Sequence, residues 1–463
     1  MQQIPFSDLK ATPGHIHEWQ LRAPEDLDPE NLGEKIASFN QEKHFLAAVS
    51  ARREHASEDY WIAITFQIPG RVDLPALESA LLYFVERHEV LRCGFEHLAG
   101  ALRCDVMSPG DVTLHHVDSG EMPTADAALG HLKAIFDQEI STLSWPLFRM
   151  GVLVNPEHST VFLAFDHIVC DGISLAVAVD QIQRAYADAS AGHQLPVEAA
   201  GSYLDFADAQ RRKYSGVTSD SPELGYWRSF IAESGALFPQ IPLDLGIEEG
   251  RMYPAHNETV QLLDDEDATA FEQLCSRHDG KLFLGLLAAV GIALGKISGA
   301  TSYYGFIPVS ERRDPQWRDS FGWFVNTMPI AFPVSIDLSF LEVLHAAQTS
   351  FKSLIKSVDV PFVKAWELLA PQYYHMRTWP FPVNFFSFID FRKMPNSDQY
   401  HIWQPSTIPN ASHTNTGNMW FYRNSSGISL NCIFPDVPQC QRTMAAYRSA
   451  IATTLTEVLR GAG

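Results

Sequence analysis

The chain has 463 residues, of which 46% are hydrophobic and 19% charged, a balance typical of a soluble globular protein. This length exceeds what one ordinary hydrophobic core serves, so it predicts two domains of roughly 200 residues each. A net charge of −21, from 55 acidic and 34 basic residues, disfavours nucleic acid as a partner.

The lack of a targeting signal and the cysteine spacing favour a cytoplasmic protein. No apolar run of about 18 residues predicts a transmembrane segment, and the opening MQQIPFSDLKATPG lacks the basic-then-apolar pattern of a secretory signal. None of the six cysteines forms a CxxC pair: they are Cys93, Cys104, Cys170, Cys275, Cys432 and Cys440. This spacing argues for a reducing compartment and against both a disulfide framework and a zinc site.

The first half of the chain alternates predicted strands and helices without a regular βαβ series. Apolar spacing near 3.6 predicts amphipathic helices at 74–88, 126–140 and 174–189. Short apolar runs predict strands at 59–68, 91–97, 101–107, 148–155 and 160–167.

The second half repeats this mixture. Strands are predicted at 257–263, 301–310, 325–334, 383–391, 419–424 and 427–434, and helices at 268–278, 282–297 and about 438–460. Gly, Ser and Pro concentrate in 190–220 and predict a boundary there, between an N-terminal lobe of residues 1–200 and a C-terminal lobe of residues 201–463. We therefore expect an α+β fold of two lobes, with a cleft between them that suits two substrates.

The stretch AFDHIVCDGISL (164–175) holds the best candidate for a catalytic base. His167 ends an apolar strand, and Gly172 allows a sharp turn into the helix that follows. A neutral imidazole suits proton removal near neutral pH. The alternative is a core histidine that bonds to the backbone.

Asp171 stands four residues after His167 across a turn. We expect it to face inward and to pair with an arginine that braces the loop, since a buried carboxylate needs such a partner. The alternative is a solvated loop aspartate.

DHIVCDG (166–172) resembles the HHxxxDG signature of condensation domains from nonribosomal peptide synthesis and of related free-standing polyketide-associated acyltransferases. Four further stretches resemble blocks of that family in the same order: FNQEKHFLA (39–47), ERHEVLRCGF (86–95), WPLFRMGVLV (145–154) and GFIPVSERRDPQWRDSFGWFVNTMPI (305–330). Five ordered blocks are more specific than one short motif, and together they cover nearly the whole chain.

The resemblance implies two chloramphenicol-acetyltransferase-like lobes in a V-shaped pseudo-dimer, with an active-site tunnel between them. It implies that His167 is the general base and that Asp171 pairs with Arg312 in a structural role. Gly172 matches the glycine whose N–H can face a developing oxyanion. The candidate substrate-binding residues are Asp166, Trp323, Asn326 and Ser387. For Asn326 we favour the alternative of a hydrogen bond at a sheet edge.

Asp166 departs from the family pattern, which has its first histidine at this position. The change favours members that acylate alcohols over those that form peptide bonds. If its carboxylate faced inward, it would raise the pKa of His167. Strand alternation favours a carboxylate that points away from the cleft.

Two histidine-containing stretches look unrelated to this chemistry. HIHEW (15–19) has the His-x-His spacing of a metal pair, but we expect no acidic or histidine cluster nearby to complete a ligand set. LHHVDS (114–119) also has two histidines followed by an aspartate, but their spacing differs from that of the HHxxxDG signature. This stretch is predicted to be an ordinary strand.

The expected reaction moves an acyl group from a thioester to a hydroxyl acceptor and forms an ester, in natural-product or complex-lipid biosynthesis. The donor is either acyl-CoA or the phosphopantetheine arm of an acyl or peptidyl carrier protein. We expect no acyl-enzyme intermediate, metal or redox cofactor, and a monomeric chain. The alternatives are amide formation with an amine acceptor in a nonribosomal peptide pathway, and a non-catalytic module that docks carrier proteins.

Overall fold

The computed structural model describes residues 1–23, 35–56, 61–98, 100–196, 198, 200–358, 360–410 and 412–461. They form two compact units. Unit 1 consists of Met1–Gly216, Ser310–Val325 and Lys393–Asn410. Unit 2 consists of Val217–Val309, Asn326–Arg392 and Ala411–Gly463.

This division differs from the predicted one in where two segments belong. The sequence placed the boundary at residue 200 and assigned the whole of 201–463 to the second lobe. In the structure the segment with Arg312 and the FGWF sequence belongs to unit 1, as does 393–410. Side-chain pairing holds the first segment in unit 1, and an added strand holds the second. The amino-acid composition of the two segments indicates neither.

Unit 1 is built on a seven-stranded sheet in the order β1-β13-β3-β8-β7-β2-β6. Its strands are β1 (Gln2–Gln3), β2 (Gly14–Arg22), β3 (Trp61–Pro69), β6 (Thr113–Met122), β7 (Phe148–Val154), β8 (His158–Asp166) and β13 (Ser406–Pro409). Neighbours from β13 to β6 run antiparallel. The strands predicted at 148–155 and 160–167 are confirmed as β7 and β8, and LHHVDS lies in β6. The strand predicted at 59–68 is confirmed from Trp61 on, since its first two residues lie outside the described ranges.

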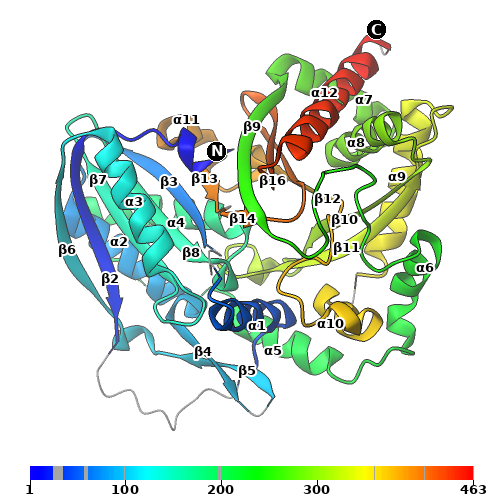
Figure 1. Cartoon of the computed structure of the whole chain (residues 1–463). Helices are drawn as coiled ribbons and strands as arrows, with labels where there is room; N and C mark the ends of the chain where they lie inside the picture. The colour runs from blue at the N-terminus through cyan, green and yellow to red at the C-terminus, as the bar shows by residue number, and fades with distance from the viewer. Residues whose placement is uncertain are drawn as a thin grey trace. The chain divides into compact units, whose positions relative to one another are not determined.

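Helices cover both faces of this sheet. The helices of unit 1 are α1 (Phe39–Arg53), α2 (Leu74–Arg87), α3 (Ala125–Glu139), α4 (Gly172–Ser190), α5 (Tyr203–Tyr214) and the short α11 (Tyr400–Trp403), and α2, α3 and α4 cover the sheet. Figure 1 shows α3 on one face and α2 with α4 on the other. Neighbouring side chains of β2 follow this division, because Glu18 contacts His131 of α3 and Trp19 bonds to Glu78 of α2. A separate hairpin pairs β4 (Cys93–Leu98) with β5 (Ala101–Val106).

Local sequence explains where these helices begin. Asp73 and Thr124 accept hydrogen bonds from first-turn N–H groups of α2 and α3. Ser38 and Gln41 form a capping box at the start of α1. Under α3 a core cluster buries Ile16, Phe136 and Phe162 almost completely, which keeps β8 and its carboxyl end rigid.

Unit 2 contains a second seven-stranded sheet, in the order β11-β10-β12-β15-β16-β9-β14. Its strands are β9 (Tyr253–Asp264), β10 (Ser302–Ser310), β11 (Val325–Pro333), β12 (Phe385–Asp390), β14 (His413–Thr414), β15 (Asn418–Asn424) and β16 (Gly427–Pro435). Its helices are α6 (Gly225–Ser234), α7 (Asp265–Arg277), α8 (Leu282–Ser298), α9 (Phe340–Ile355), α10 (Phe362–Leu369) and α12 (Pro438–Gly461). All the strands and helices predicted in the second half are confirmed, and so is the expectation of an α+β fold in two lobes.

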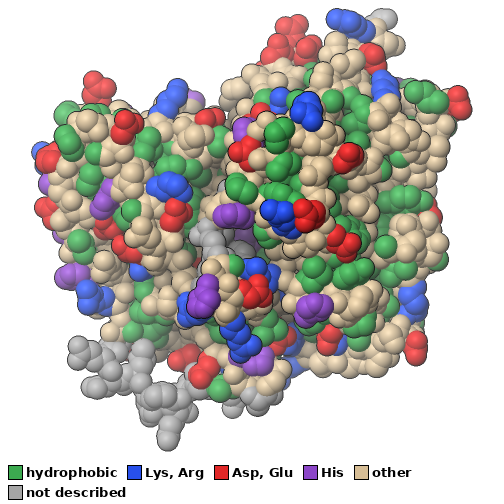
Figure 2. Space-filling view, in the orientation of Figure 1, with side chains coloured by type: hydrophobic (Ala, Val, Ile, Leu, Met, Phe, Trp, Pro, Cys, Tyr) green, Lys and Arg blue, Asp and Glu red, His purple; other side chains and the backbone are tan. Residues whose placement is uncertain are grey.

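The apolar helix α8 is the core helix of unit 2, and α7, α9 and α12 pack against it (Figure 1). No helix of the described residues can by itself span a membrane; α7 and α8 together have sufficient length and hydropathy but are bent by 99°. On the face in Figure 2, acidic side chains are interspersed with lysines and arginines.

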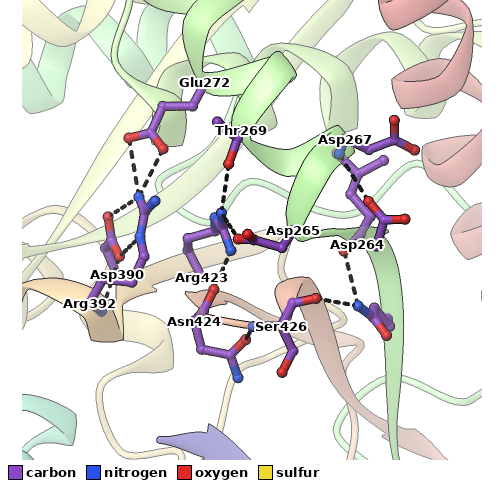
Figure 3. Close-up of polar contacts among 12 residues, drawn as sticks. Asp264, Asp265, Asp267, Thr269, Glu272, Asp390, Arg392, Arg423, Asn424 and Ser426 are labelled. Atoms are coloured by element: carbon purple, nitrogen blue, oxygen red, sulfur yellow. Dashed lines mark hydrogen bonds and ion pairs between the residues drawn. The ribbon is translucent and has the colours of Figure 1, made fainter. Parts of the chain in front are cut away.

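Two arginines tie α7 to the sheet of unit 2 (Figure 3). Arg423 on β15 is 1% exposed and binds Asp265 at 2.6 Å. Arg392 binds Glu272 of α7 at 2.9 Å and Asp390 of β12 at 2.8 Å (Figure 3). Because each cation has a carboxylate partner, the helix N-terminus and the strand ends are held together without an unpaired buried charge.

Candidate active site

The loop between β8 and α4 carries His167. β8 ends at Asp166, a single 3-10 turn spans His167–Val169, and α4 begins at Gly172. The imidazole is half-buried, and its Nδ1 atom is enclosed without a hydrogen-bond partner among the described residues. Nε2 is therefore the ring nitrogen left to meet a substrate.

Two effects lower the pKa of the His167 imidazole. Burial lowers its pKa below the usual value of 6.5, and repulsion from His44 lowers it further. Asp166 and Asp171 raise the pKa by less. Asp166 thus raises the pKa of His167 as expected, but by less than burial lowers it. A neutral imidazole at pH 7 is the form that accepts a proton.

Asp166 is 1% exposed and fully engaged by its neighbours. Its Oδ1 atom lies 2.9 Å from Nε2 of His44 and accepts the N–H of Ile168 at 2.8 Å. Its Oδ2 atom accepts the hydroxyl of Thr142 at 2.6 Å. Its carboxylate therefore braces the loop from within unit 1.

Helix α1 supplies two side chains that the sequence did not identify. His44 contacts Asp166, and Gln41, one helical turn earlier, donates to the carbonyl of Ile168 at 3.0 Å. Residues three apart share a helix face, so both reach the same loop. Both residues lie in the FNQEKHFLA block, and their i, i+3 spacing is the local signal that they share one face of the helix.

Trp323 lies beside both histidines. Its ring centre is 4.4 Å from that of His167 and 5.6 Å from that of His44. The structure thus places this predicted substrate-binding residue next to the His167 ring.

Asp171 and Arg312 form a buried bidentate ion pair. The Arg312 Nη1 and Nη2 atoms lie 2.6 and 3.0 Å from the two carboxylate oxygens of Asp171, and both side chains are at most 5% exposed. Asp171 also caps α4 by accepting the N–H of Ser174 at 2.9 Å, and it accepts the N–H of Phe324 at 3.0 Å. One carboxylate therefore holds the start of α4 and the segment that carries Trp323.

Gly172 is the first residue of α4. The N–H groups of a first helical turn have no partner within the helix and lie at its positive end. Gly172 follows His167 by five residues in the chain. The position of its N–H group suits a donor to a developing negative charge.

Asn326 and Ser387 belong to unit 2 and are not part of this group. The Asn326 amide accepts the N–H of Phe362 at 2.9 Å and donates to the carbonyl of Val360 at 3.2 Å. These bonds fasten the start of α10 and agree with the backbone-bonding alternative rather than with substrate binding. Ser387 is buried in β12 opposite Trp420 of β15.

Comparison with known proteins places this chain in a family. The condensation-domain family matches residues 34–378. The chain belongs to the condensation-domain family. It is 27% identical over 431 residues to "Acyltransferase PapA3" of Mycobacterium tuberculosis, covering 91% of this chain and 88% of that protein. It is 28% identical over 406 residues to "2'-acyl-2-O-sulfo-trehalose (hydroxy)phthioceranyltransferase PapA1" of Mycobacterium bovis, covering 85% and 76%.

Solved structures show the same fold. The structure entitled "PapA2 acyl transferase" superposes with a TM-score of 0.86 at 22% identity, covering 99% of this chain and all of that one. The first condensation domain of the calcium-dependent antibiotic synthetase superposes with a TM-score of 0.70 at 15% identity, covering 92% and 96%. These likenesses confirm the predicted fold, and the relatives identify the chain as a condensation-type acyltransferase.

Proposed function

We propose that this acyltransferase moves an acyl group from a thioester to a hydroxyl group and that His167 is its general base. The observation that carries this proposal is the position of the His167 imidazole just after β8, in a loop that is braced on both sides. Asp166 and His44 hold one side of the loop, and Asp171 and Arg312 hold the other.

The step balances without a covalent enzyme intermediate. Nε2 of His167 takes the hydroxyl proton while the oxygen forms a bond to the thioester carbonyl carbon. The N–H of Gly172 donates to the oxyanion that develops on the carbonyl oxygen. The carbon–sulfur bond then breaks, the thiolate leaves, and it takes the proton from His167. The products are an ester and a thiol, and holding both substrates together supplies the proximity.

The names of the relatives support a carbohydrate hydroxyl as the acceptor. PapA1 is named for a sulfo-trehalose substrate, and "Trehalose-2-sulfate acyltransferase PapA2" is 26% identical to this chain over 438 residues. We propose an acceptor of the same class, a hydroxyl group of a sugar, and a donor that is either acyl-CoA or an acyl group on a carrier-protein phosphopantetheine.

Mass spectrometry of the products tests this proposal. Purified protein is supplied with acyl-CoA or acyl-phosphopantetheine carrier protein, and with trehalose or an amine as acceptor. We expect an ester product, and we expect His167→Ala to lower kcat by about 10²–10⁴. His193→Ala is the control, because this exposed histidine pairs with Asp188 at the far end of α4.

The pH profile of the rate gives a second readout. Because burial lowers the pKa of His167, the rate should stay near its pH 7 value as the pH falls through 6.5. It should decline only when the pH reaches the lowered pKa and the imidazole gains a proton.

An unchanged rate in His167→Ala would refute the general base. An amide product would favour the peptide-pathway alternative, and carrier-protein binding without turnover would favour a docking module.

A further inference from the structure

The two histidine-containing stretches outside the catalytic loop meet on adjacent strands of unit 1. HIHEW lies in β2 and LHHVDS in β6, which pair antiparallel at the end of the sheet. His15 stands opposite Glu121, and His17 stands opposite Asp118. The prediction that no cluster lies near the His-x-His pair is therefore wrong, because strand pairing brings together residues that are far apart in the sequence.

A β-bulge places these side chains on one face of the sheet. The register passes from Ile16 opposite Gly120 to His17 opposite Asp118, which leaves Ser119 unpaired. Gly120 has a φ of +86°, in the left-handed region that favours glycine. Without the extra residue, alternation would put Asp118 on the face opposite to Glu121.

On this shared face, nitrogen and oxygen atoms that can bind a metal ion lie close together. The Nδ1 atom of His15 lies 3.1 Å from Oε1 of Glu121, and its Nε2 atom contacts Oδ1 of Asp118. The Nδ1 atom of His17 lies 3.1 Å from Nε2 of His116. One ligand atom from each of His15, His17 and Asp118 lies within 4.8 Å of the others.

These spacings suit a metal ion. Zn²⁺ binds imidazole nitrogen and carboxylate oxygen at about 2.0–2.2 Å, so ligand atoms around one tetrahedral ion are on the order of 3.5 Å apart. Small side-chain rotations bring the three atoms to that distance. Imidazole ligands favour Zn²⁺, Ni²⁺ and Cu²⁺ over Mg²⁺ and Ca²⁺.

We propose that His15, His17 and Asp118 form a surface site for Zn²⁺ or a similar divalent transition-metal ion, with His116 as a fourth ligand. None of these residues takes part in the site around His167. A bound ion would link the edge strand β6 to β2 through side chains.

The charge balance of the cluster supports a cation. The carboxylates of Asp118 and Glu121 both lie against the His15 ring, so two negative charges stand beside the imidazole nitrogens. A divalent cation bound between the rings and Asp118 would offset this charge.

Isothermal titration with Zn²⁺ tests the proposal on untagged full-length protein that has been treated with a chelator and dialysed. We expect one ion per chain, measured independently by elemental analysis, and a rise of a few degrees in Tm when Zn²⁺ is added. His17→Ala and Asp118→Asn should each weaken binding by about tenfold or more.

His115→Ala is the matched control, because this exposed histidine neighbours His116 in β6 and alternation turns it to the other face. It should leave the affinity unchanged. Asp118 is exposed, so Asp118→Asn should fold even if His17→Ala does not. The proposal is overturned if the parent protein binds no Zn²⁺, or if Asp118→Asn and His115→Ala bind it as tightly as the parent does.

Discussion

Three side chains from three separate parts of unit 1 define the chemistry at His167. Asp166 bonds to His44 from α1, and the rings of His44 and His167 lie 6.4 Å apart. Trp323 contacts both rings. His44 therefore has two effects, since it satisfies the buried carboxylate of Asp166 and it lowers the pKa of His167.

We expect His44→Ala to change both the pKa of His167 and the support of its loop. Without the repulsion from His44, the pKa of His167 rises, so the acid limb of the pH–rate profile should move to higher pH. We also expect kcat to fall by about tenfold while KM changes less, because the loop around Asp166 loses one support. Steady-state rates from pH 5 to 8 measure both effects, with His193→Ala as the control. A lower kcat with an unmoved pH profile would assign His44 a purely structural role.

At the scale of elements, the start of α4 is the point where several segments are joined. Asp171 caps the helix, pairs with Arg312 and accepts the N–H of Phe324. Ser174 adds to the same junction by donating to the carbonyl of Gly322 at 2.8 Å. The position of the His167 loop therefore depends on a buried ion pair rather than on the turn alone.

Breaking this pair should be costly. Arg312→Gln leaves the buried carboxylate of Asp171 without its cation and should lower the free energy of unfolding by roughly 3–5 kcal/mol. Asp171→Asn should cost a similar amount, and the double variant should cost less than the sum of the two. Denaturant unfolding of all four proteins gives the coupling. Additive losses would show that the two side chains act independently.

At the scale of the whole molecule, the fold contains histidines that remain neutral in its interior. His88 is buried: its Nε2–H donates to Gln181 at 2.7 Å, and its Nδ1 accepts the N–H of Phe321 at 3.3 Å. Burial lowers the pKa of His88 to about 3. The unfolded chain, in which a histidine has a pKa near 6.5, therefore binds protons that the folded chain excludes.

This difference predicts a loss of stability in acid. The contribution of His88 is fully present above pH 6.5 and is lost as the pH falls from 6.5 toward 3, by on the order of 1 kcal/mol per pH unit. His167 adds to the loss in the same direction. His88→Gln removes the titrating group, so its stability should fall less steeply with acid than that of the parent. Thermal unfolding between pH 7 and 4.5 measures both slopes, and equal slopes would contradict the assignment.

Much of this protein follows from local sequence. The predicted strands and helices appear where the apolar periodicity placed them, because a strand or helix must present one face to a core. The motif around His167 predicted the base that we propose, and the ordered blocks pointed to Arg312 as the partner of Asp171. These features depend on short-range pattern or on family resemblance, which a single sequence carries.

The tertiary structure decided what depends on long-range pairing. Thr407 of β13 pairs with Ile64 of β3, so a late segment completes the sheet of unit 1. His44 reaches Asp166 only because α1 packs against the loop after β8. The bulge in β6 brings Asp118 onto the face of His15 and His17. Contacts between residues distant in the chain are set by packing of whole elements, and local periodicity does not record them.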